Sequence, residues 1–359
     1  MKKTLYKALA VAMTMVAALS ATAQDGTTAY NFLDVTPSSH VYGLGGHNVS
    51  LIDDDIQLVE QNPALLGPEF EQLVGLNYMR YMGSSNFMGA RYGTGINDRS
   101  AWAAAIQYFG YGTMTATDVE GNVTGSFSAS DMAFSGTYSH DINDNWRGGI
   151  TMKFLYSSYE SYSAMAIAAD LGVSYYDPEN DFSAGLVLKN LGGQVKKFAD
   201  NYDKLPWDVQ VGLTKGFQNS PFRISLTLTD LTKWHLPYYT PAPNSGSSSD
   251  LIKKDSFGRN LLRHITLAAE YAPTERMYIG LGYSYKTRTD MSTYARNFVS
   301  GFSLCAGLRV RGFGFGVAVA QPHSGATTLM LNISTSINEL MREPADDLIS
   351  HRFSSRSSR

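Results

Sequence analysis

The feature that most constrains this chain is an alternation of apolar residues with small or polar ones, which recurs from about residue 73 onward. A period of two is typical of a β-strand, because successive side chains point to opposite faces. In MYIGLGYSYKT, at 277–287, one face holds Met277, Ile279, Leu281, Tyr283 and Tyr285, and the other holds Gly280, Gly282, Ser284 and Lys286. Such a strand has one apolar face and one small or polar face.

Fourteen segments follow this alternation. They are 73–80, 85–93, 101–109, 130–139, 146–157, 162–176, 182–190, 207–216, 222–231, 264–272, 277–288, 301–310, 313–320 and 327–337. A tilted strand needs about 9 to 11 residues to cross a hydrocarbon layer, and an even number of strands returns both chain ends to one side. The sequence therefore predicts an all-β fold, a 14-stranded antiparallel transmembrane β-barrel with both termini in the periplasm.

The connections between these segments provide an independent test. From the second connection onward, every other one is short and rich in Asn, Asp, Pro and Gly: GTGINDRS, HDINDN, DPEND, FQNSP, PTER and RG. Most of the others are longer: about 110–129, 191–206, 232–263 and 289–300. Outer-membrane barrels show this asymmetry, with short periplasmic turns and longer outer loops. The connections at 81–84, 158–161 and 321–326 are short exceptions.

Composition and charge narrow the class further. The chain has 22 Tyr and 17 Phe beside 33 Gly, and no uninterrupted apolar run of about 18 residues follows the N-terminal leader, which excludes a helical membrane protein. The leader contains three of the 29 basic residues, so 26 remain against 32 acidic residues. That balance argues against a nucleic-acid partner.

The N-terminus, MKKTLYKALAVAMTMVAALSATAQ, reads as a secretory signal with cleavage after Ala23. An exported chain whose one cysteine is Cys305 has no internal disulfide framework. We expect four parts: a signal peptide at 1–23, an N-terminal plug segment at 24–72, the barrel at 73–337 and a periplasmic tail at 338–359.

The expected plug contains LIDDDIQLVEQNPALLG at 51–67. Asp53 or Asp54 would cap a short helix, and Pro63 would end it. Adjacent acids project in different directions, whereas calcium loops alternate their ligands, so a metal site is the weaker alternative. A catalytic carboxylate pair needs two side chains that converge on one bond, and nothing nearby supplies such a partner. A structural role is therefore expected for the plug motif: Asp53, Asp54, Asp55, Asn62, Pro63 and Ala64.

Catalytic groups are scattered. The seven histidines lie in plug, turns, loops and tail without a Ser/His/Asp arrangement, so we expect no enzyme, no cofactor and no metal. Inward-facing cations offer a different role, because residues such as Lys153 and Arg223 could bind an anionic ligand or pair with plug acids such as Glu60. Pairing is the favoured reading. Cys305 is expected to fill space in the lumen.

The longest outer loop, 232–263, begins TKWHLPYYTPAP. Four apolar or aromatic residues lie among its prolines: Trp234, Leu236, Tyr238 and Tyr239. Rigid aromatic residues beside a Gly/Ser-rich segment are typical of protein recognition, which would make these four a partner-binding site. A loop that folds over the barrel mouth explains them equally well, and the sequence leaves both readings open.

The order GLGG-x-N-V-S-L-x-DDD-x-x-L-x-x-Q-NPALL, at 43–67 and ahead of a long barrel, resembles the PorQ family of the type IX secretion system. This family is similar to FadL, the long-chain fatty acid transporter, whose relatives also carry an Asn-Pro-Ala segment in an N-terminal plug before fourteen strands. The sequence departs from most such barrels in continuing beyond Ile337 to Arg359 instead of stopping at a terminal aromatic residue.

The resemblance implies an integral outer-membrane protein that does not act as an enzyme. It would anchor the attachment complex at the cell surface, holding a PorZ-like partner together with a PorU-like sortase and a PorV-like barrel. The alternative is a FadL-like transporter of hydrophobic small molecules. Small, polar inward residues favour a plugged barrel, whereas a transporter needs an apolar path.

Overall fold

The computed structural model describes residues 30–341, except 82, 199–201, 218–219, 237, 242–248, 253–255, 275, 291–298, 311 and 324–325. For 238–241, 249–252, 322–323, 326 and 339–340 only the backbone is described. The expected signal peptide at 1–23 and the tail from 342 onward lie outside the described residues.

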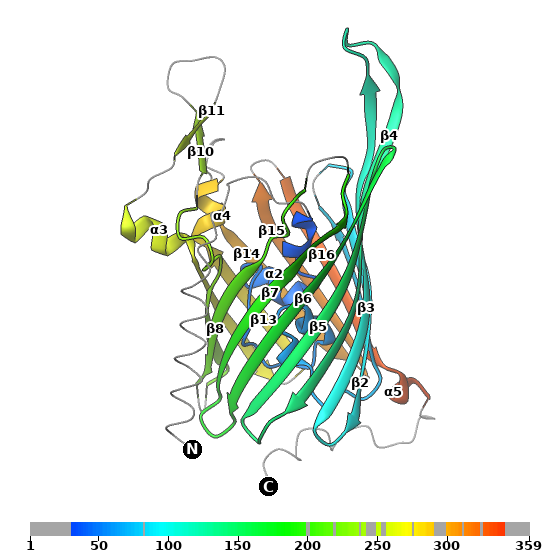
Figure 1. The fold of residues 1–359 in the computed structure, drawn as a ribbon. Coiled ribbons are helices and arrows are strands. Elements are labelled where there is room, and N and C mark those ends of the chain that lie inside the picture. Colours follow the sequence, from blue (N-terminus) through cyan, green and yellow to red (C-terminus); the bar gives the residue numbers. More distant parts are fainter. Residues whose placement is uncertain are drawn as a thin grey trace, which may run out of the picture.

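Fourteen strands form one closed antiparallel barrel (Figure 1). They are β1 Leu73–Arg80, β2 Asn86–Asn97, β3 Ser100–Thr117, β4 Val123–Asp141, β5 Trp146–Tyr159, β6 Tyr162–Asp177, β7 Phe182–Lys196, β8 Asp208–Gly216, β9 Phe222–Leu228, β12 Ile265–Thr274, β13 Met277–Ser284, β14 Phe302–Val310, β15 Phe313–His323 and β16 Ala326–Ser336. Each strand pairs with its sequence neighbours, and β1 pairs with β16 to close the ring. The predicted fold class is confirmed, and each predicted segment corresponds to one strand.

The barrel exterior is apolar because the alternation points large side chains outward. In β13, Ile279 and Leu281 are exposed on the outer face, whereas Gly280 is buried on the inner face. Among the described residues, no helix is both long enough and apolar enough to cross a membrane. Large apolar side chains in this fold therefore gather in two places, on the outer surface of the barrel and in a core inside the lumen.

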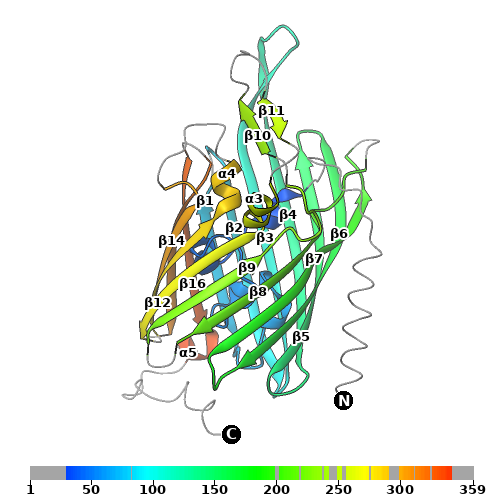
Figure 2. The same ribbon diagram turned by 90° about the vertical axis from the view of Figure 1, so that its left-hand side faces the viewer.

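The two ends of the barrel differ. At one end, which we call the short-turn end, tight turns join the strands, and at the other, the long-loop end, longer structures project (Figures 1 and 2). These are the upper parts of β3 and β4, the hairpin of β10 (Tyr238–Pro241) and β11 (Ser249–Ile252), and the helices α3 (Phe257–Arg263) and α4 (Tyr285–Asp290). The pattern did not predict this hairpin or the full length of β3 and β4, because apolar alternation stops where a strand leaves the apolar zone.

Residues 30–72, which we call the plug segment, lie inside the barrel and contact its wall (Figure 1). Their helical turns are η1 (Asn31–Asp34), α2 (Ser39–Gly43), η2 (Ile56–Glu60) and η3 (Pro63–Leu65). The backbone N–H of Ser39 donates to Asn332 Oδ1 at 2.9 Å, and Ser139 Oγ donates to the Leu66 carbonyl at 2.8 Å. A further short helix, α5 (Ile337–Met341), follows the last strand.

The local structure of the plug motif corrects the sequence prediction. Asp55, not Asp53 or Asp54, caps the helix, and that helix is a 3-10 helix. It already ends at Glu60, while Pro63 begins the next turn, η3. Proline suits a first helical position because its missing N–H has no helical partner there, so Pro63 starts a turn instead of stopping one.

Candidate functional site: the filled lumen

The plug segment is held by a set of ion pairs nearer the short-turn end, which we call the ion-pair layer. Its members are His40, Asp53, Asp54, Glu60, Arg91, Lys153, Asp170, Arg223, Glu270 and Arg309. Four come from the plug segment and six from the wall. The predicted pairing of inward cations with plug acids therefore appears at several points around the ring.

His40 is the centre of one half of this layer. Its Nε2 lies 2.5 Å from Glu270 Oε2, its Nδ1 lies 2.9 Å from Asp53 Oδ2, and its ring stacks on Tyr278 with centroids 3.7 Å apart. Burial alone would lower the pKa of His40, but the carboxylates of Glu270 and Asp53 outweigh it and raise the pKa to about 9. The imidazole is therefore a buried cation between two anions. Arg223 extends the chain by contacting Glu270 at 2.8 Å.

Glu60 is the centre of the other half. Its carboxylate lies 2.5 Å from Arg91 Nη2 and 2.8 Å from Lys153 Nζ, and Lys153 also contacts Asp170 at 2.7 Å. Burial by itself would raise the pKa of Glu60, but Lys153 and Arg91 lower it to about 2. All four side chains are buried. Glu60 of the plug segment and Asp170 of the wall together thus balance the two cations, Arg91 and Lys153, that the wall places in the lumen.

The three consecutive acids have three different partners. Asp53 contacts His40, Asp54 Oδ2 lies 2.7 Å from Arg309 Nη1, and Asp55 accepts hydrogen bonds from Ser38 Oγ at 2.6 Å and the Gln57 N–H at 3.0 Å. Their side chains therefore diverge. In the part of the chain that the structure describes, no group of three or more His, Cys, Asp or Glu residues is arranged to hold a metal ion.

Asn62 connects the Asn-Pro-Ala motif to the wall. Its Nδ2 donates to the carbonyls of Val49 at 3.0 Å and Val173 at 3.3 Å, and its Oδ1 accepts from the Ala64 N–H at 3.0 Å. The wall has a glycine opposite it, since a Cβ at Gly172 would lie 1.9 Å from Asn62 Oδ1. The small inward residues noted in the sequence are places where the plug segment touches the wall.

The same close approach occurs at the glycine turn of the plug segment. A Cβ at Gly282 would lie 2.2 Å from the backbone nitrogen of Gly45, which itself has a φ of +100°. A Cβ at Gly45 itself would lie 2.4 Å from Thr266 Cγ2, so Gly45 needs both the space and the backbone freedom of glycine. Cys305 is buried in the wall against Gly43, as a small residue filling the lumen.

Closer to the long-loop end, the lumen is apolar over part of its circumference. Wall residues Met79, Phe87, Phe109, Leu155 and Met330 pack there with plug residues Phe32, Leu33 and Tyr42, a group that we call the apolar belt. Cross-strand register puts Met330, Met79, Phe87 and Phe109 at one level, because each is the direct partner of the next.

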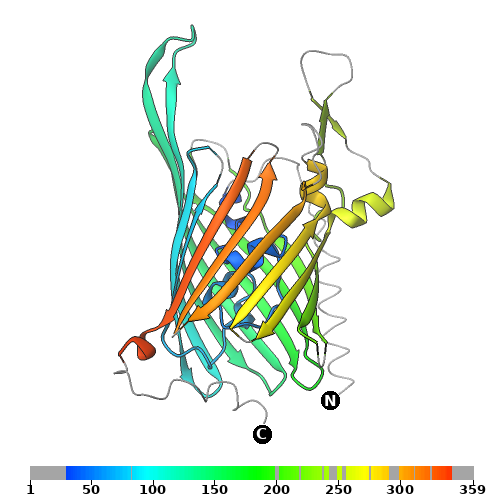
Figure 3. The same ribbon diagram turned by 180° about the vertical axis from the view of Figure 1, so that it is seen from behind.

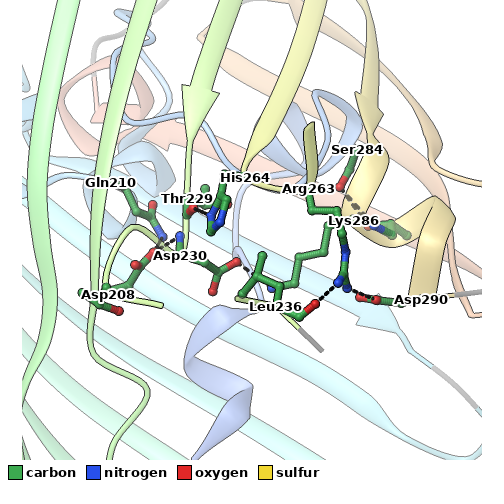
Figure 4. Close-up of polar contacts among 12 residues, drawn as sticks. Asp208, Gln210, Thr229, Asp230, Leu236, Arg263, His264, Ser284, Lys286 and Asp290 are labelled. Atoms are coloured by element: carbon green, nitrogen blue, oxygen red, sulfur yellow. Dashed lines mark hydrogen bonds and ion pairs between the residues drawn. The ribbon is translucent and has the colours of Figure 1, made fainter. Parts of the chain in front are cut away.

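On the other side of the long-loop end, a rim cluster fastens two loops to the barrel (Figure 4). Lys286 Nζ lies 2.6 Å from Asp230, and Arg263 contacts Asp290 at 2.6 Å. Asp208 Oδ2 accepts hydrogen bonds from Gln210 Nε2 at 3.0 Å and from the Asp230 N–H at 2.8 Å. These contacts fix the base of the loop over 229–264.

The rim cluster also locates the expected partner-binding residues. Trp234 stacks on His264 with ring centroids 5.3 Å apart and keeps 42% of its surface exposed, whereas Leu236 is buried. The side chains of Tyr238 and Tyr239 lie outside the described residues, although their backbone forms β10. The base of the loop folds onto the rim, while its β10–β11 hairpin projects (Figure 3), and partner binding by this loop stays a prediction.

The sequence did not single out His40 and Glu270 as partners. His40 is 230 positions from Glu270, and no local motif links them. The one available signal is Glu270 itself, an acid on the small-residue face of an alternating strand, where an ionised group needs a partner.

A closed barrel with an apolar exterior and a lumen filled by its own N-terminal segment defines a plugged membrane β-barrel. No protein-family model and no curated protein matches the sequence. Solved structures do match the fold. The P. putida toluene transporter TodX is 10% identical, with 85% of this chain and 99% of that chain covered and a TM-score of 0.52. The CymD monoaromatic hydrocarbon channel is 12% identical, with 86% and 99% covered and a TM-score of 0.51.

A Pseudomonas aeruginosa FadL homologue also matches, with 12% identity, 84% and 98% coverage and a TM-score of 0.48. TodX and CymD thus share the fold of this chain. At these identities the likeness concerns architecture, and the PorQ assignment stays a prediction.

Proposed function

We propose that this protein is an integral outer-membrane barrel through which small hydrophobic molecules enter the cell. The observation that carries the proposal is the apolar belt, a hydrophobic compartment at the end where the long loops of such barrels face outward. A water-filled pore does not fit a lumen in which plug and wall pack this closely. TodX and CymD, which share the fold, are named as a toluene transporter and a monoaromatic hydrocarbon channel.

The barrel wall adds a second apolar surface. An open groove of about 550 Å³ lies across β8, β9, β12 and β13, and its lining includes the outward-facing residues Leu213, Leu267 and Leu281. Behind it, the turn at Gly45 touches the wall at Gly282. Passage would require the plug segment to shift, because Phe32 and Leu33 occupy the belt.

Uptake by whole cells tests this proposal, since the lipopolysaccharide layer is the barrier that such a channel overcomes. Cells lacking their own hydrophobic-compound channels should take up toluene faster when they make this protein, while arabinose entry stays unchanged. Phe87→Gln places an amide in the belt and should slow toluene uptake, and Phe87→Leu should retain it. Equal toluene uptake with and without the protein would refute passage.

We propose anchoring of a surface protein as the second candidate, in line with the PorQ resemblance and with type IX secretion. The observation that favours it is the projecting β10–β11 hairpin, which carries Tyr238 and Tyr239 above a fixed base. Trp234→Ala, Tyr238→Ala and Tyr239→Ala together should cost about 2 kcal/mol or more of binding energy. The co-purifying surface protein should then be lost while membrane levels of the barrel stay normal.

The contacts of Trp234 require a matched control. Trp234→Ala also removes the stack on His264, so partner loss in the triple variant could reflect a displaced loop. The variant carrying only Tyr238→Ala and Tyr239→Ala leaves the rim cluster intact. An unchanged complex in both variants would exclude this loop as the binding surface.

A further inference from the structure

Strands β3 and β4 extend far beyond the rest of the barrel. They contain 18 and 19 residues, whereas about 9 to 11 suffice to cross a membrane. Strand β2 pairs with β3 only as far as Gly110, and β5 pairs with β4 only as far as Ala129. Beyond these residues the two strands pair only with each other, forming what we call the projecting ribbon, 111–128 (Figures 1 and 3).

Both edges of the projecting ribbon lack a neighbouring strand among the described residues. At its base, the Tyr111 carbonyl accepts from Ser84 Oγ at 3.4 Å and the Ser128 carbonyl accepts from the Glu160 N–H at 3.2 Å. Above the base, the edge over 113–117 is continuous, whereas the β4 edge is interrupted because pairing skips Thr124. A run of five residues matches the usual length of a strand.

Proteins normally protect such edges with lysine, proline or a covering element. The sequence YGTMTATDVEGNVTGSFS at 111–128 has no Lys, Arg or Pro, and its charges are Asp118 and Glu120 at the tip. It is instead rich in Thr and Val, which favour strands. The edge over 113–117 is therefore open to strand addition and unopposed by charge.

The tip is well ordered although the edges are open. Asp118 Oδ1 accepts hydrogen bonds from the N–H groups of Glu120 at 3.0 Å and Asn122 at 2.8 Å, and Gly121 supplies the positive φ that the turn needs. Val119 and Val123 are exposed beside these acids. An isolated two-stranded hairpin is only marginally stable in water, so a third strand would stabilise this one.

We propose that the β3 edge at 113–117 binds an extended strand of a second, different polypeptide by β-strand addition. Backbone hydrogen bonds supply the affinity in this mode, and side-chain contacts supply the selectivity. The acids and valines at the tip select a strand flanked by basic and apolar residues, because the ribbon offers negative charge and no positive charge.

This inference does not require the barrel to conduct. It gives the anchoring candidate a surface of its own, since the ribbon and the β10–β11 hairpin stand on opposite sides of the barrel mouth in Figure 1. The two surfaces can therefore be tested separately. If the tyrosine variants lose the partner and the ribbon shows no contact, strand addition fails and anchoring stands.

Amide hydrogen exchange of the full chain tests the open edge. Native outer membranes should protect amides within 113–117, and purification in detergent should raise their exchange, because the added strand is removed. The matched control is the set of amides within 123–127 that point away from β3, on the opposite edge, whose exchange should be the same in both preparations. Equally fast exchange of 113–117 in both preparations would overturn the proposal.

Photocrosslinking identifies the occupant. A benzophenone amino acid in place of Thr115 should yield, in intact cells, an adduct with a different polypeptide, and the crosslinked peptide should be extended and carry Lys or Arg nearby. Deleting 113–117 together with 124–128, which shortens both strands, should abolish co-purification of that polypeptide while the barrel assembles. An adduct with a second copy of this chain, with lipopolysaccharide or with nothing would overturn the proposal.

Discussion

The ion-pair layer and the apolar belt hold the same plug segment by different physics. In the layer, Glu60 and His40 each contact two groups of opposite charge. These pairs form only when the plug is in one position and when both side chains are charged. In the belt, Phe32 and Leu33 pack against apolar wall residues without directional contacts. The layer fixes the position of the plug by paired charges, whereas the belt holds it by the fit of apolar side chains.

The largest effect should come from the layer. Glu60→Gln leaves Arg91 and Lys153 buried in the lumen with reduced charge compensation, and removing one partner of a buried pair costs about 3–5 kcal/mol. The loss of stability is measured by urea unfolding, with the gel mobility of the folded barrel as the readout. The matched control is Glu69→Gln, whose half-exposed contact with Arg147 should cost less than about 1 kcal/mol. Equal losses would contradict the distinction between buried and exposed pairs.

The belt should respond to volume and not to charge. Leu155→Ala removes a fully buried side chain and should destabilise the barrel by roughly 3 kcal/mol. The loss should be the same at pH 5 and pH 8, because no titratable group is removed. Leu171→Ala on the lipid-facing side is the control and should cost less. A pH-dependent loss of stability in Leu155→Ala would show that the apolar belt and the ion-pair layer are coupled.

The pH dependence of plug retention should come from the layer. The pKa of His40 is raised to about 9, so its stabilising contribution is complete below its unfolded value near 6.5 and disappears as pH rises through 9. The pKa of Glu60 is lowered to about 2, so its contribution is complete above its unfolded value near 4.5 and declines as pH falls toward 2.

We therefore expect the plug to be held most firmly between about pH 4.5 and 6.5, with a change on the order of 1–3 kcal/mol on the alkaline side. Hydrogen exchange of α2 measures retention. His40→Gln should remove the alkaline step and leave the acid step. The groups that contact His40 are Asp53, Glu270 and Tyr278, with Arg223 on the far side of Glu270. An alkaline step that persists in His40→Gln would contradict its assignment to His40.

The smallest effects should come from the other two acids of the motif. Asp55→Ala removes a helix cap and should cost about 1 kcal/mol. Asp54→Asn breaks a half-exposed pair with Arg309 and should cost less than about 1 kcal/mol. Both should reduce heat resistance slightly without changing bound metal, which elemental analysis can follow. A calcium ion lost in either variant would show that these acids are ligands.

Much of the barrel could be read from local pattern. A lipid-facing strand must alternate, so each of the fourteen strands produced a signal within its own residues, and β13 shows it over eight. The signal ended where the chain left the apolar zone, which is why the upper part of β3 and the β10–β11 hairpin were missed. Strand formation there depends on backbone pairing alone.

What the sequence by itself determined is the closed barrel, the number of its strands and the presence of inward cations that need partners. The tertiary structure alone decided which partners meet, as when barrel closure brings Glu270 and Arg223 to His40 and the fold of the plug brings Glu60 to Arg91 and Lys153. The physical reason is the length of chain on which each feature depends. Alternation reflects the contact of each strand with its surroundings, residue by residue, whereas an ion pair across the lumen depends on the register of many strands at once.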